Sequence, residues 1–263
     1  MIARRATRFV VMASMLVGFA ATGPHAAGQS ADSAPSAQAS VTANQIVAKV
    51  IKHNELRNAE LHKYSAVRVY EIKDLSGNVK ASKTVRMEYF APDTKKFESI
   101  KEDGSAIVRD LVFDRLMETE AATAGGHERR DSSITPANYS FHLIGQEDIG
   151  AHHCYVVEAS PKREDKYLFR GQIWIDSTDY AVVRIAGHPA KRPSFWVTRA
   201  DFVRQFEKVG DFWLPSRDET SVDVRFYGTK ILSIEHRIDS VNGVTSTSEA
   251  FHGGLGGNVA AMR

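Results

Sequence analysis

Apolar and polar residues alternate along several short runs between positions 138 and 238, and the run 167–176 shows the alternation best. One side of that run would carry Tyr167, Phe169, Ile173 and Ile175, and the other Arg170, Gln172 and Asp176. Period-two alternation is typical of a strand with one buried and one solvated face. Because the pattern recurs with turn residues in between, it predicts a large antiparallel sheet with one apolar face.

Two other segments have helical spacing. Thr42 and Gln45 match a capping box that would open a helix at roughly 43–61. A second helix, ending before Gly125, is predicted from apolar residues on one face, namely Ile107, Val108, Leu111, Val112 and Leu116. Strands are predicted at 64–73, 80–90, 95–102, 138–147, 152–159, 166–176, 180–187, 195–207, 211–215, 220–227 and 230–240. The expected fold is therefore α+β, with a curved sheet of about 10 or 11 strands and two helices.

The N-terminus indicates export. Three arginines precede a short apolar run, and small residues follow it, so residues 1–28 are predicted to be a secretory signal peptide. The apolar run is shorter than the roughly 20 residues that span a bilayer, although a retained membrane anchor stays the alternative. We expect a flexible leader at 29–41, one domain at 42–240 and a flexible tail at 241–263. The expected location is the periplasm, as a soluble protein.

Composition excludes several classes of protein. Removing the three signal arginines from a formal charge of +2 leaves −1, with no basic patch, so nucleic-acid binding is not expected. Cys154 is the one cysteine, which excludes an internal disulfide framework and a lipid anchor behind the signal. His152 and Cys154 would share one face of a strand while His153 points away, and two ligands do not make a zinc site. We predict no metal, no cofactor and no catalytic residues, and we expect a monomer.

Four segments carry a family resemblance: NYSFHLIGQEDIG, HHCYVVEASPK, YLFRGQIWIDSTDYAVVRIAGHPAKRPSFW and FEKVGDFWLP. With the opening helix and the hairpins that follow, they resemble the outer-membrane lipoprotein-sorting (LolA/LolB-like) superfamily over most of the mature chain. The resemblance implies a half-barrel whose concave apolar face is covered by helices and holds acyl chains of a lipoprotein. It also implies an arginine that helps to close the helical lid, to which no position of this sequence is assigned.

The alternation predicts which residues would line such a cavity. They are Val85, Met87, Tyr89, Tyr167, Phe169, Ile173, Ile175, Val183, Ile185, Trp196, Phe202, Phe206, Val222, Val224 and Phe226, followed by Leu232, Ile234 and Ile238, with Leu111, Val112 and Leu116 in the lid. Acyl chains suit such a lining because each buried methylene contributes about 0.8 kcal/mol without a directional partner. The alternative is that these residues form an ordinary core.

The loop 187–194 is predicted to lie at the rim, where Lys191 and Arg192 could contact a phosphate or a lipid headgroup. A stiff connection with solvated charges is the alternative. The hypothesis from the sequence is thus a periplasmic protein that binds a lipid or a lipidated protein, with a possible envelope membrane partner. Two other functions stay open: a sensor of the RseB/MucB type, for whose second domain the chain has no room, and an unrecognised hydrolase.

Overall fold

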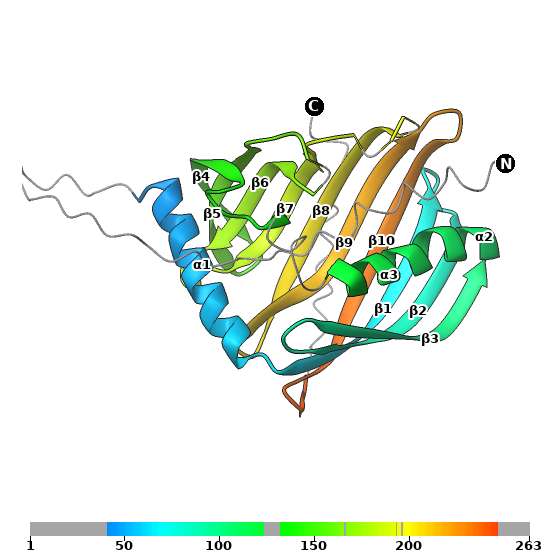
Figure 1. The fold of residues 1–263 in the computed structure, drawn as a ribbon, viewed down its shortest axis with the longest axis horizontal. Coiled ribbons are helices and arrows are strands. Elements are labelled where there is room, and N and C mark those ends of the chain that lie inside the picture. Colours follow the sequence, from blue (N-terminus) through cyan, green and yellow to red (C-terminus); the bar gives the residue numbers. More distant parts are fainter. Residues whose placement is uncertain (1–40, 124–131, 166, 193, 196, 247–263) are drawn as a thin grey trace, which may run out of the picture.

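One antiparallel sheet forms the body of the protein (Figure 1). The computed structural model describes residues 41–123, 132–165, 167–192, 194–195 and 197–246. Its strands are β1 (Lys63–Asp74), β2 (Val79–Phe90), β3 (Thr94–Gly104), β4 (Tyr139–Ile149), β5 (His152–Pro161), β6 (Phe169–Asp176), β7 (Val182–Pro189), β8 (Val197–Val209), β9 (Phe212–Val224), β10 (Gly228–Val241) and β11 (Val244–Thr245). The predicted signal peptide, the leader up to residue 40 and the tail from residue 247 lie outside the described residues.

The strand order is β3-β2-β1-β10-β9-β8-β7-β6-β5-β4, with β11 paired to β10. Two meanders, β1–β3 and β4–β10, are joined because β1 pairs with β10, so the ends of the domain meet inside the sheet. The sheet curves without closing, and both helical segments lie on its concave side (Figure 1). The predicted α+β fold with an open, curved antiparallel sheet is confirmed.

The first helix, α1 (Ala43–Glu60), begins as its sequence predicts. The Thr42 side chain accepts a hydrogen bond from the backbone N–H of Gln45, and the Gln45 Oε1 accepts one from the backbone N–H of Thr42 at 2.9 Å. This reciprocal box satisfies two N–H groups that a helix start otherwise leaves unpaired. The helix then buries Ile46, Val47 and Val50 against the sheet.

The second helical segment has three parts: α2 (Ala106–Val108), a π-helical turn (Arg109–Asp114) and α3 (Arg115–Thr123). The sequence predicted its buried side from regular spacing, and Leu116 is buried as predicted. Ile107, however, is exposed, and Phe113 and Met117, which were not predicted, are buried. A π-helical turn takes up an extra residue, which rotates the inward direction away from a regular helical stripe. The helix was therefore predicted correctly, but part of its buried side was wrong.

Three details of the strands differ from the prediction. The predicted strands 211–215 and 220–227 are one strand, β9. Its centre is polar because Asp218 forms an ion pair with Arg204 and a hydrogen bond with His236, and these polar residues interrupt the alternation. Phe226 follows β9 in a turn and has φ +70°. The predicted tail begins with a short hairpin, since Val244 pairs with Val241.

The outer face of the sheet near β5–β7 is also buried. Cys154, Val156, Trp174, Val183 and Ala186 form a cluster there, opposite the face that packs on α1. Val183 reaches this side because the β6–β7 register shifts between Trp174 and Ile175, which leaves Val182 and Ile185 on the α1 side. The expectation of one solvated face does not hold at this end of the sheet.

Candidate binding face on the concave side of the sheet

Most of the predicted lining residues lie on the concave face, in three apolar clusters. At the α1 end, Phe169, Ile173, Ile175 and Ile185 are buried, with Phe202 and Phe206 partly buried against them. Beneath the second helical segment lie Val85, Val112, Leu232 and Ile234 together with Phe113. Met87, Tyr89 and Ile238 belong to the third cluster, which lies near the start of β1. The face is therefore already packed at both ends.

Not every predicted residue belongs to these three clusters. Val183 is on the outer face, Phe226 is 85% exposed in the β9–β10 turn, and Trp196 lies outside the described residues. Tyr167, Leu111, Val222 and Val224 are half-buried, while Leu116 is buried. Lys191 and Arg192 are exposed in the connection between β7 and β8. Val183 and Phe226 are thus outside the part of the set that the concave face gathers, whereas Val222 lies on the concave side of β9, on the same face as Phe202.

The middle of the concave face is the part that no described helix covers (Figure 1). The α1 helix lies over the strands at one end, and α3 lies over β10 to β3 at the other. Phe202 and Phe206 of β8 and Val222 of β9 stay partly exposed in between, next to the partly exposed Leu232 of β10 at the border of the second helical segment. We call these four residues the middle strip.

A belt of charged side chains crosses the same face, which the sequence analysis missed. Arg68 of β1 is 2% exposed and donates from Nη1 to Oε2 of Glu120 on α3 at 2.8 Å. Lys95 of β3 donates to the other carboxylate oxygen at 2.5 Å. Farther along, Lys83 of β2 holds Asp114 at 2.6 Å. With the Arg109–Glu102 pair at 3.2 Å, these ion pairs attach the second helical segment to β1, β2 and β3.

The Glu120 carboxylate is strongly held in its charged form. Burial alone would raise its pKa, but the charges of Arg68 and Lys95 outweigh burial and hold the pKa well below its usual range. One local feature of the sequence indicates this ion pair, a charged residue at an apolar position of a strand. Arg68 stands in the apolar phase of a strand that otherwise buries Tyr64, Ala66 and Tyr70.

The belt continues on the neighbouring strands. Asp218 of β9 forms an ion pair with Arg204 of β8 and accepts a hydrogen bond from Nε2 of His236 of β10 at 3.1 Å. Burial raises the pKa of Asp218, but Arg204 and His236 lower it to about 2. Burial and the nearby Arg68 lower the pKa of His236. His236 is thus neutral at neutral pH and acts as a donor to Asp218.

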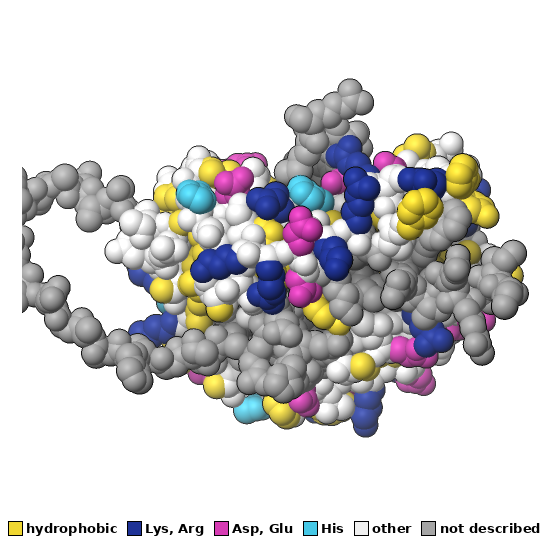
Figure 2. Space-filling model, turned by 45° about the horizontal axis from the view of Figure 1, so that its top comes forward, with side chains coloured by type: hydrophobic (Ala, Val, Ile, Leu, Met, Phe, Trp, Pro, Cys, Tyr) yellow, Lys and Arg dark blue, Asp and Glu magenta, His cyan; other side chains and the backbone are white. Residues whose placement is uncertain are grey.

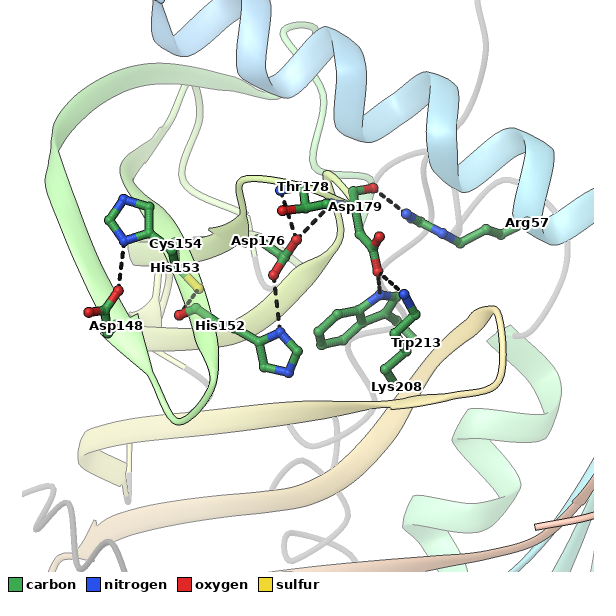
Figure 3. A network of polar contacts seen from close by, with 10 residues as sticks. All are labelled: Arg57, Asp148, His152, His153, Cys154, Asp176, Thr178, Asp179, Lys208 and Trp213. Atoms are coloured by element: carbon green, nitrogen blue, oxygen red, sulfur yellow. Dashed lines mark hydrogen bonds and ion pairs between the residues drawn. The ribbon is translucent and has the colours of Figure 1, made fainter. Parts of the chain in front are cut away.

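A separate polar network holds α1 against the sheet (Figure 3). Asp179, in the β6–β7 turn, accepts from Trp213 at 3.0 Å and pairs with Lys208 at 2.6 Å, both near the β8–β9 hairpin. Arg57 of α1 donates to the backbone carbonyl of Asp179. The network therefore joins one helix and two hairpins, which fixes the position of α1 on the concave face.

The same region contains His152, Cys154 and Asp176, residue types that build thiol active sites (Figure 3). His152 contacts Asp176 at 3.1 Å, but the Cys154 thiol donates to the backbone carbonyl of His152 and not to its imidazole. Burial raises the pKa of Cys154 to about 12, whereas a nucleophile needs a thiolate. These residues therefore do not form a nucleophile–base pair.

Neither a metal site nor a membrane-spanning helix is found in the described part of the chain. No three His, Cys, Asp or Glu side chains gather there in a way that could hold a metal ion. Among the same residues, no helix combines the length and the apolar character needed to cross a membrane.

No protein-family model and no curated protein matches the chain. Similar solved structures include a DUF1329 family protein from Desulfovibrio piger, 13% identical with a TM-score of 0.38, over 74% of this chain and 90% of that one. A LolA superfamily protein from Nitrosomonas europaea is 9% identical with a TM-score of 0.33, over 75% and 92%. MucB of Pseudomonas aeruginosa, solved in complex with MucA, is 10% identical with a TM-score of 0.27, over 73% and 94%. A member of the LolA superfamily, which the sequence resembles, is thus among the similar solved structures.

Proposed function

We propose that this protein binds a long acyl chain, carried by a lipid or a lipidated protein, along the middle strip, and that it works as a carrier in the periplasm. One observation carries the proposal: both helices lie on the concave face, yet Phe202, Phe206 and Val222 between them stay partly exposed. Apolar side chains that line an inner face without being fully covered are typical of a site for an apolar ligand.

The energetics favour a long chain. Each buried methylene contributes about 0.8 kcal/mol, so about ten of them contribute about 8 kcal/mol. Association costs roughly 4–15 kcal/mol in lost freedom of motion. A short chain therefore gains too little to stay bound. Release needs no chemistry, because a bilayer or a partner offers the acyl chain the same gain.

The attachment of the second helical segment supports the same function. Its ion pairs with Arg68, Lys95 and Lys83 fix one border of the middle strip by directional contacts, in addition to apolar packing. A border held in this way keeps its place whether or not an apolar ligand fills the strip.

The first experiment is native mass spectrometry of the protein purified from its own envelope. The second is displacement of a bound fluorescent fatty acid by fatty acids of 8 to 16 carbons, roughly the range in which the free energy of burial exceeds the cost of association. We expect a co-purifying acyl species and affinity that rises with chain length. Phe206→Gln should weaken binding about tenfold, which corresponds to losing about two methylenes' worth of contact. Leu56→Gln, at an exposed site of α1, is the matched control and should bind as the wild type. An apo mass with no uptake of the probe would overturn the proposal.

A further inference from the structure

Large apolar side chains are exposed along one edge of the sheet. Phe226 and Tyr227 in the β9–β10 turn are 85% and 72% exposed, and Phe195 before β8 is 71% exposed. Leu75 in the β1–β2 turn and Ile107 at the start of α2 are each 71% exposed. Exposed apolar residues are ordinary when they are scattered, but a group of them marks a contact surface.

The strand register places these segments next to one another. Val197 at the start of β8 pairs with Val224 at the end of β9, and Asp74 at the end of β1 pairs with Lys230 near the start of β10. Ala81 pairs with Gly104, just before α2. The turns therefore follow one another along the end of the sheet where β1, β3, β7 and β9 finish. We call this row of turns the apolar edge. The β9–β10 turn lies at the upper right of Figure 1, and Figure 2 shows hydrophobic and basic side chains side by side at the upper right of the molecule.

The backbone conformation at the tip of the turn is unusual for its residue. Phe226 has φ +70°, in the left-handed region that favours glycine and costs other residues stability. Turn tips ordinarily carry Gly, Asn, Asp or Ser. An aromatic ring that is 85% exposed in this conformation is a candidate for contact with another molecule.

The charge of the same edge is positive. Segments 71–80, 102–109, 191–195 and 223–230 contain seven Lys and Arg residues against five Asp and Glu residues, a surplus of two positive charges. Arg225 lies over the ring of Phe195, 4.4 Å from its centroid, so a cation and an aromatic ring occupy the same place. Lys191 and Arg192, the predicted headgroup residues, are exposed in the neighbouring connection.

We propose that the apolar edge docks on the surface of an anionic phospholipid bilayer. Phe195, Phe226 and Tyr227 enter the boundary between headgroups and acyl chains, where aromatic rings are favoured. The surrounding Lys and Arg side chains contact the lipid phosphates, which adds an attraction that salt weakens. The docking goes beyond acyl binding by the middle strip, and it explains how a carrier could meet the membrane it exchanges with.

The test is co-sedimentation with vesicles of phosphatidylglycerol and phosphatidylcholine, compared with vesicles of phosphatidylcholine alone. Phe226→Gly removes the ring and also relieves the left-handed strain, so this variant should be at least as stable as the wild type. We expect the wild type to bind the anionic vesicles and Phe226→Gly to bind them at least tenfold more weakly. Val244→Ser changes an apolar residue that is 72% exposed in the β10–β11 hairpin, at the opposite end of β10, and should bind as the wild type.

Three outcomes would overturn the proposal: no binding of the wild type to anionic vesicles, equal binding of Phe226→Gly, or equal binding to both kinds of vesicle. Self-association of the wild type that Phe226→Gly abolishes, without vesicle binding, would also overturn it and assign the edge to a second copy of the chain. Fatty-acid uptake by the same variants separates this proposal from the function proposed above, because Phe226 is not part of the middle strip.

Discussion

Replacement of Glu120 by Gln tests whether ion pairs hold the second helical segment on the sheet. The Glu120 carboxylate contacts Arg68 at 2.8 Å and Lys95 at 2.5 Å, and the side chains of Arg68, Lys95 and Glu120 are 2%, 6% and 16% exposed. Breaking one side of a buried ion pair typically costs about 3–5 kcal/mol, because the other charge stays buried without compensation. Since Gln can still accept one hydrogen bond, we expect a loss of about 3 kcal/mol in the free energy of unfolding.

The assay is thermal and denaturant unfolding of Glu120→Gln beside Glu118→Gln. Glu118 lies on the same helix and pairs with Arg115, but its side chain is 63% exposed, so its loss should cost less than about 1 kcal/mol. A cost of 3 kcal/mol lowers the melting temperature by about 6–12 °C in a domain of this size. Hydrogen exchange of residues 106–123 should accelerate in Glu120→Gln alone. Equal stability of the two variants would refute the reasoning.

A double variant adds a second check on the same pair. Arg68→Met with Glu120→Met removes both charges of this pair and keeps most of the apolar volume. It leaves Lys95 without its carboxylate, whereas Glu120→Gln leaves both Arg68 and Lys95 without theirs. Replacing a buried ion pair by apolar residues is often neutral or stabilising, so the double variant should be more stable than Glu120→Gln. A double variant that is less stable than the single one would show that the two residues act through other contacts.

Three further predictions concern pH, packing and capping. His236 has a lowered pKa in the folded state, so its contribution should be complete above the ordinary histidine pKa and decline as the pH falls below about 6.5. Asp218, with a pKa of about 2, should add a second decline below about pH 4, and a stability that is flat from pH 7 to pH 3 would contradict both. Gly171→Ala should destabilise by about 2 kcal/mol or more, because its Cβ would lie 2.1 Å from the carbonyl oxygen of Ala186, whereas Gly145→Ala has open space and should be close to neutral in the same unfolding assay. Thr42→Ala should cost about 1 kcal/mol through the lost N-cap, measured by urea unfolding, and a change below a few tenths would mean that the α1 start contributes little.

The sequence by itself determined the type of almost every element. Period-two alternation marks strands wherever one face packs on the core, and the capping box with apolar residues at helical spacing marks α1. These signals are local, because they depend on side-chain direction over a few residues. For the same reason the alternation alone predicts the buried residues of β6, namely Phe169, Ile173 and Ile175.

The tertiary structure alone decided which faces and charges meet. The β6–β7 register shift moves Val183 to the outer face, and the π-helical turn rotates the second helix so that Phe113 points inward. Arg68 and Glu120 are 52 residues apart in sequence, and they form an ion pair because α3 packs over β1. Local periodicity contains no information about such long-range contacts, and these contacts decide where the concave face is apolar and where it is charged.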